Sequence, residues 1–444
     1  MLIALTVLAA LGTTPCIDAL EQLHLATIEN YGPYHLLSQA QQSRVAKLKD
    51  VLLDDARGVQ SLRACQPTLD AYLGQFRDPH LYVDAAWPEP PRIQLPSRRV
   101  LAQRLKQDAG AGISGRWYDA EGSIAIVQDP THPGRYLAIR QPQHRLFAVL
   151  EHDRQQWSIS WNDGALWRQQ PAALRRDGQL LAYGVRGMAR AGASGFAPTD
   201  PLAPHYQRLT DQIGMLSMPS FMPQYAGPLR AIVDRHGGEW ATLRGLIVDI
   251  RGNAGGDAIY VPLAPWILDG PIELERATNM LVSPAAQRYL RSALADDKLN
   301  ARMAAQPGQI IAYREPSTVN LPTYMPRPLR IVLLQDAGVG SAAEAFVRQA
   351  TQSARVVSFG AATRGNIDTM QALSIDLGKG RWRFRFGFPL YFDRALPEQG
   401  VNAAGLAPQL PLALPEHRWI TFAVNWITKF EETALATGRA PPAR

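Results

Sequence analysis

The stretch G-L-I-V-D-I-R-G-N-A-G-G-D, residues 245–257, decides how the second half of this chain folds. It begins with an apolar run as long as a buried strand and ends in a glycine-rich turn. A second stretch, R-I-V-L-L-Q-D-A-G-V-G-S-A-A-E-A-F at residues 330–346, repeats the pattern and continues into a helix that starts at Ser341. Alternation of strands and helices around both stretches predicts an α/β sandwich with a largely parallel sheet.

Ser341 stands between a predicted strand and a predicted helix. The tetrapeptide S-A-A-E has a purely structural interpretation as a capping box, with Ser341 as the N-cap and Glu344 at the third helical position. The alternative is a nucleophile at a helix N-terminus, where the helix dipole favours negative charge on the hydroxyl oxygen. The buried strand before Ser341 and the glycine turn upstream favour the nucleophile.

The glycine turn that follows the first strand also has two interpretations. It is either a plain tight turn or a nest of N–H groups that binds an anion. In the second case Gly255 or Gly256, together with the amide of Ala342, would bind the oxyanion formed when a serine attacks a carbonyl. Asp249 and Arg251, at the end of the strand, are predicted to form an ion pair that braces the turn.

Together these motifs resemble the catalytic domain of the C-terminal-processing (tail-specific) serine peptidases. The resemblance rests on three segments in a fixed order: D-I-R-G-N-A-G-G at residues 249–256, S-A-A-E at 341–344 and G-A-A-T-R-G at 360–365. It covers roughly the last half of the chain. It implies a ClpP/crotonase-like α/β sandwich, a peptide or protein substrate, and no cofactor or metal.

The base that activates the serine differs between branches of this family. A serine needs such a base because its hydroxyl is a poor nucleophile at neutral pH. The tail-specific branch carries a lysine directly after the third motif, where this chain has Asn366. The tricorn-like branch instead takes a histidine in a D-x-H frame from an N-terminal helical region. This chain has D-P-H at residues 78–80, so the resemblance implies His80 as the general base.

The tricorn-like branch also uses a glutamate near a C-terminal G-x-x-P signature. Here G-L-A-P occupies residues 405–408, which makes Glu398 the candidate for the carboxylate that orients the histidine. Asp78 is its competitor. Tricorn has a further serine immediately before its histidine, and this chain has Pro79 there.

The N-terminal residues 1–14, M-L-I-A-L-T-V-L-A-A-L-G-T-T, form an uncharged apolar run that ends in small residues. We interpret them as a signal peptide; the alternative is the first turn of a core helix. The run is too short to span a bilayer as a helix. The chain has two cysteines, Cys16 and Cys65, each in a helical pattern. Behind a signal peptide they predict a disulfide; the alternative is two buried thiols.

The composition of the chain limits the class of protein to which it can belong. With 46% apolar and 19% charged residues, the 444-residue chain is an ordinary globular protein. The net charge is +7, but the basic residues are scattered, and no basic run is interleaved with aromatic residues. Nucleic-acid binding is therefore not expected. The positive balance would favour acidic partners or a position close to a membrane surface.

Four segments follow from the patterns. They are a signal peptide at 1–14, a helical domain at 16–88, a β-rich insert at 89–204 and the α/β catalytic domain at 205–430. The aromatic residues of the insert either fill its core or line a ligand groove. The chain is thus expected to be an exported serine endopeptidase, periplasmic or secreted, that works through an acyl-enzyme. The alternative is a catalytically silent binding protein on the same fold that carries an apolar ligand or a peptide.

Overall fold

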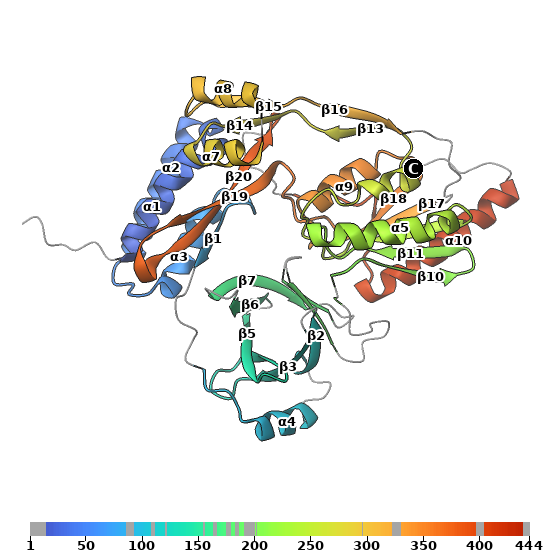
Figure 1. Cartoon of the computed structure of the whole chain (residues 1–444), viewed down its shortest axis with the longest axis horizontal. Helices are drawn as coiled ribbons and strands as arrows, with labels where there is room; N and C mark the ends of the chain where they lie inside the picture. Colours follow the sequence, from blue (N-terminus) through green and yellow to red (C-terminus); the bar gives the residue numbers. More distant parts are fainter. Residues whose placement is uncertain are drawn as a thin grey trace, which may run out of the picture.

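The computed structural model describes residues 15–437 except 86–92, 108–111, 120–121, 154–155, 163–166, 175–178, 183–185, 191–199, 201, 295, 322–329 and 397–403. These residues form three bodies, one of which is a barrel at the bottom of Figure 1. Among the described residues, no helix is both long enough and apolar enough to cross a membrane. The predicted signal peptide lies outside the described residues.

Three N-terminal helices form one side of the first body: α1 (Pro15–Asn30), α2 (Gln39–Asp55) and α3 (Leu62–Gly74). A capping box between Ser38 and Gln41 starts α2, and the hydroxyl of Ser61 caps α3. The apolar stripe of each helix faces inward, as the helical period of the sequence predicts.

A five-stranded antiparallel sheet packs against these helices. Its strands are β1 (Tyr82–Ala85), β14 (Thr278–Leu281), β15 (Ile310–Arg314), β19 (Thr369–Leu377) and β20 (Phe384–Asp393), and the helices α7 (Pro284–Ala293) and α8 (Asp297–Ala305) belong to the same body. Strand β20 pairs with β1, β14 and β19. Its phenylalanines at 384, 386 and 388 enter the same core as Leu20 and Leu69. The sheet therefore crosses the predicted boundary between the helical and the catalytic segments.

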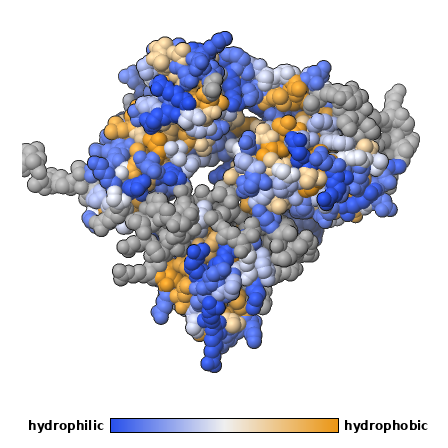
Figure 2. Space-filling model, in the orientation of Figure 1, coloured by the Kyte–Doolittle hydropathy of each residue, from blue (hydrophilic) through white to orange (hydrophobic). Residues whose placement is uncertain are grey.

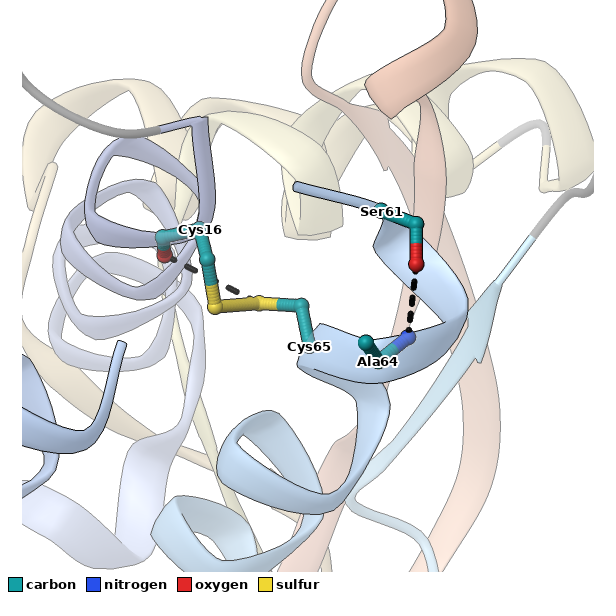
Figure 3. The surroundings of a disulfide bond; sticks show 4 residues. All are labelled: Cys16, Ser61, Ala64 and Cys65. Carbon is teal, nitrogen blue, oxygen red and sulfur yellow. Dashed lines mark hydrogen bonds between the residues drawn. A yellow bond between two sulfur atoms is a disulfide. The ribbon is translucent and has the colours of Figure 1, made fainter. Parts of the chain in front are cut away.

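The predicted disulfide is confirmed. Cys16 at the start of α1 and Cys65 in the first turns of α3 are bonded, with their Cα atoms 5.6 Å apart (Figure 3). Both cysteines are fully buried in the core of the first body. The bond fastens α3, which leads directly to His80, to the first helix of the chain.

Replacing both Cys16 and Cys65 by alanine should lower the stability of the first body by about 4 kcal/mol, because the bond closes a loop with a sequence separation of 49. Urea unfolding followed through the first body should show the shift, and reduction of the wild-type protein should reproduce it. An unchanged unfolding midpoint, with two free thiols in denatured, unreduced wild-type protein, would contradict this prediction.

The second body is a closed barrel of eight strands in up-and-down order. They are β2 (Gly115–Asp119), β3 (Gly122–Gln128), β4 (Arg135–Arg140), β5 (Arg145–Asp153), β6 (Gln156–Asn162), β7 (Trp167–Leu174), β8 (Gln179–Ala182) and β9 (Arg186–Arg190). Trp117 and Trp161 are buried in one core of the barrel, which favours the core interpretation for these two aromatic residues. The helix α4 (Arg98–Gln107) covers a second apolar face through Leu101.

The third body contains a six-stranded sheet whose core strands are parallel, as predicted. The strand order is β10 (His205–Thr210), β11 (Ile213–Ser217), β12 (Gly245–Asp249), β17 (Arg330–Gln335), β18 (Val356–Gly360) and β21 (Leu410–Pro411). The helices around it are α5 (Ala226–Trp240), α6 (Ala264–Ile267), α9 (Ala342–Ala350) and α10 (Trp419–Thr437). A strand pair, β13 (Gly270–Glu275) and β16 (Ser317–Leu321), reaches toward the first body (Figure 1).

Candidate active site

Ser341 lies at the sharp turn between β17 and α9, where the sequence predicts it. Ser341 forms a capping box with Glu344, so it is also the N-cap of α9, as the structural interpretation of the S-A-A-E tetrapeptide predicts. However, an N-cap residue normally has an extended backbone, whereas Ser341 has φ 52° and ψ −123°. Positive φ strains a residue that has a side chain, and such strain persists only where the surroundings impose it. A plain cap does not need this conformation, but a nucleophile presented on a strand–turn–helix does.

The carboxylate of Glu344, which is fully buried, fixes the backbone around Ser341. It accepts four hydrogen bonds: from Thr363 Oγ1 (2.5 Å), Gly365 N–H (2.8 Å), Asn366 N–H (2.8 Å) and Ser341 N–H (3.1 Å). The S-x-x-E and G-x-x-T-x-G motifs therefore form one hydrogen-bonded unit. This explains in physical terms why the two motifs occur together.

Asn366, at the position of the family lysine, holds the same turn from its other side. Its Oδ1 accepts a hydrogen bond from Ser341 N–H at 2.6 Å. The sequence marks Asn366 only as a departure from the family pattern, and its role as an acceptor for the Ser341 amide was not predicted. Asn366 is 5% exposed, so its short amide side chain occupies the space beside the serine.

The glycine turn after β12 is braced as predicted. Arg251 donates from Nε and Nη2 to the two carboxylate oxygens of Asp249, at 2.8 and 2.6 Å. Asp336, directly after β17, accepts hydrogen bonds from Gly252 N–H (2.8 Å) and Gly338 N–H (3.0 Å). One carboxylate therefore joins the two glycine turns and sets their separation.

The three predicted oxyanion donors lie around this junction, but they are not equivalent. Gly255 N–H already donates to Asn253 Oδ1 at 2.9 Å. Within the described chain, no hydrogen bond uses the N–H of Gly256 or of Ala342. A Cβ atom on Gly255 would stand 2.8 Å from Ser341 Cβ and 2.9 Å from Ala342 N. Gly255 thus lets the turn approach the serine, while Gly256 and Ala342 keep amides available for an anion.

His80 lies on the loop between α3 and β1 and is 6% exposed. Its backbone N–H donates to Asp78 Oδ1 at 2.9 Å. Its ring Nδ1 is 2.9 Å from the hydroxyl of Thr369, which in turn donates to Asp78 Oδ1 at 2.9 Å. Burial, with a further contribution from Asp78, raises the pKa of the nearby Tyr31 hydroxyl well above its usual value. Tyr31 therefore stays protonated beside the Asp78 carboxylate.

His80 and Ser341 belong to different bodies and are not hydrogen-bonded to each other. One short segment joins them: residues 363–366 bind the serine turn, and Thr369, three residues later at the start of β19, binds the histidine. In Figure 1 the chain between β18 and β19 runs from the third body to the first. Figure 2 shows an opening in the middle of the molecule, between the bodies.

Glu398, the predicted orienting carboxylate, lies outside the described residues. Its competitor Asp78 is present beside His80, with a fully buried side chain. The sequence suggested Asp78 but gave no signal for Thr369, because the two are separated by 291 residues. Only the pairing of β19 with β20, and of β20 with β1, brings Thr369 to the loop that carries His80.

Part of the chain is similar to a known protein family, and the fold is similar to that of solved structures. Residues 212–383 match the model of peptidase family S41. The fold is similar to that of mature CPAF (TM-score 0.50, 12% identity, 96% of this chain and 99% of that one) and of a CPAF mutant (TM-score 0.52, 12% identity, 97% and 100%). The photosystem II D1 C-terminal processing protease matches with a TM-score of 0.37 and 14% identity, over 91% of this chain and 94% of that one.

No curated protein sequence matches the chain. At 12% identity the likeness to CPAF shows a shared fold. The segment that matches the family model carries β12, β17 and α9, with the serine turn between β17 and α9. Residues 212–383, which are less than half of the 444-residue chain, are similar to peptidase family S41, and this match supports a serine peptidase.

Proposed function

We propose that the protein is an exported serine endopeptidase in which Ser341 is the nucleophile and His80 is the general base. The observation that carries the proposal is the backbone of Ser341. It is held at φ 52° on the N-terminus of α9, beside the unengaged amides of Gly256 and Ala342. Acyl transfer needs an activated serine and N–H groups that are available to bind the oxyanion.

The reaction follows from these positions. Ser341 Oγ attacks the carbonyl carbon of a peptide bond while His80 Nε2 takes the hydroxyl proton. The amides of Gly256 and Ala342 bind the oxyanion. When the intermediate collapses, the C–N bond breaks and His80 returns the proton to the leaving amine. Water, deprotonated by His80, then attacks the acyl-enzyme; the ester C–O bond breaks, His80 returns the proton to Ser341 Oγ, and the new carboxylic acid leaves. Glu398 stays a predicted orienting carboxylate for this histidine.

For His80 to act on Ser341, its ring must move into hydrogen-bond distance of the serine hydroxyl, because the two residues are not hydrogen-bonded here. The segment 363–369 is hydrogen-bonded at one end to the serine turn and at the other to His80, which limits how far apart the two residues can lie. Substrate binding in the opening would complete the contact, because catalytic hydrogen bonds often tighten only when substrate is bound.

His80→Gln should slow the labelling of Ser341 by a fluorophosphonate probe by about 10²–10⁴-fold, because the hydroxyl loses its base. His132, exposed at a barrel turn, provides the matched control as His132→Gln, which should label at the wild-type rate. Labelling of His80→Gln at the wild-type rate would exclude His80 as the base.

Export is the second part of the proposal. It is supported by the signal-like segment 1–14 and by the disulfide between Cys16 and Cys65, a bond that forms in oxidising compartments. The mature N-terminus of protein from the periplasm or medium should lie near residues 12–15. Protein found only in the cytoplasm, with its first residues intact, would contradict export.

One observation favours the alternative, a binding protein without catalytic activity: His80 and Ser341 are not hydrogen-bonded to each other. Labelling with the fluorophosphonate probe distinguishes a peptidase from a binding protein. A carrier on this fold would leave the probe unreacted at Ser341, whereas a peptidase would be modified there.

A further inference from the structure

The hydroxyl of Thr369 stands between a carboxylate and an imidazole, both buried. It is 2.9 Å from Asp78 Oδ1 and 2.9 Å from His80 Nδ1, while the direct distance from His80 Nδ1 to Asp78 Oδ1 is 3.7 Å. Thr369 itself is fully buried. The strongest polar link from the carboxylate to the ring of His80 therefore passes through the threonine.

Counting protons fixes the direction of this link. An ionised carboxylate can only accept hydrogen bonds, and a threonine hydroxyl has one hydrogen to donate. The Thr369 hydrogen is given to Asp78, so its oxygen must accept from the ring. His80 Nδ1 then carries the proton, and Nε2 has a free lone pair.

We propose that Thr369 is a positioning residue of the active site, which relays the charge of Asp78 to His80 and holds the imidazole in the Nδ1–H tautomer. This inference rests on the proposed function of His80 as the base. The same carboxylate also binds the backbone N–H of His80 at 2.9 Å, so ring and backbone are held from one side. In this proposal Asp78 and Thr369, rather than Glu398, perform the orienting role that a carboxylate performs directly in other serine peptidases.

The geometry also explains how this site works with Pro79, where tricorn has a serine. Proline has no side-chain hydroxyl to orient the ring. Here the hydroxyl comes instead from β19, which the sheet places next to the loop. Because Asn366 on the same segment binds the Ser341 amide, one stretch of chain positions both members of the pair.

The first test is the tautomer, read from nitrogen-15 NMR of histidine-labelled protein with the His80 signals assigned by their loss in His80→Gln. The neutral wild-type ring should carry its proton on Nδ1, and Thr369→Ser should keep it there. Thr369→Val should lose this preference. Thr369→Ala adds no atoms to the buried position and should also lose the preference for the Nδ1–H tautomer. It replaces the valine variant in this test if that variant does not fold.

The matched control is Thr278→Val. Thr278 is a buried threonine at the start of β14, which also pairs with β20, and within the described part of the chain its hydroxyl has no hydrogen-bond partner. This variant should match the wild type in both readouts, because valine replaces a hydroxyl that bonds to nothing there.

The second readout is the rate of fluorophosphonate labelling. Thr369→Val should label on the order of 10²-fold more slowly than the wild type, with Thr369→Ser restoring most of the rate. If the wild type is not labelled at all, the proposed function fails, yet the tautomer still decides the role of Thr369. An Nδ1–H tautomer that persists in both Thr369→Val and Thr369→Ala would overturn the inference.

Discussion

Ser341→Ala should fold normally and lose both peptide hydrolysis and probe labelling, with a fall in kcat on the order of 10⁴–10⁶. Alanine has no nucleophile, and no other group can form the acyl-enzyme. The loss of the cap should cost only about 1 kcal/mol. Alanine also suffers no more than serine from φ 52°, since both carry one Cβ.

The matched control for this variant is Ser292→Ala. Ser292 is an exposed serine near the end of α7 whose hydroxyl bonds only a local backbone carbonyl. It should be labelled and should hydrolyse peptides like the wild type. Full activity in Ser341→Ala, confirmed on purified and folded protein, would remove Ser341 from the mechanism.

Glu344→Gln should inactivate the enzyme although the change replaces a single oxygen by an amide nitrogen. Each carboxylate oxygen of Glu344 accepts two hydrogen bonds. A glutamine can keep one oxygen and must turn NH₂ toward the other pair of donors. If the NH₂ group faces Thr363 and Gly365, both of these donors lose their acceptor. If it faces Asn366 and Ser341, only the Asn366 N–H does, because Ser341 N–H keeps Asn366 Oδ1. The cost should be about 1–3 kcal/mol for each donor left without an acceptor.

The activity should fall because the loop of Thr363, Gly365 and Asn366, which holds the serine turn, would lose part of its attachment to residue 344. Thermal unfolding and probe labelling measure the two effects separately. Glu273→Gln, on the exposed side of β13, is the control and should leave both unchanged. A Glu344→Gln protein with wild-type stability would show that the buried carboxylate does not organise the turn.

Much of the third body could be predicted from the sequence because its signals are local. An apolar run, a glycine turn and a capping box within residues 330–346 place Ser341 between a strand and a helix. The ion pair of Asp249 and Arg251 joins residues two positions apart. The disulfide was predictable because the chain contains only two cysteines.

The parts that were not predictable depend on contacts between distant segments. The strands β14, β15, β19 and β20 carry no sequence signal that they join the N-terminal helices, because pairing partners in a sheet are not encoded locally. The Thr369 hydroxyl meets His80 only through that pairing, across 289 residues. Likewise, the positive φ of Ser341 follows from hydrogen bonds made by Glu344 and Asn366, and not from the serine itself.

The most direct test of the central claim is to map the fluorophosphonate adduct on the folded, disulfide-bonded wild-type protein by peptide mass spectrometry. We expect one adduct, on the peptide that contains Ser341, with a rate that falls in His80→Gln. An adduct on another serine, or none on protein whose fold and Cys16–Cys65 bond are intact, would contradict the assignment of Ser341 as the nucleophile.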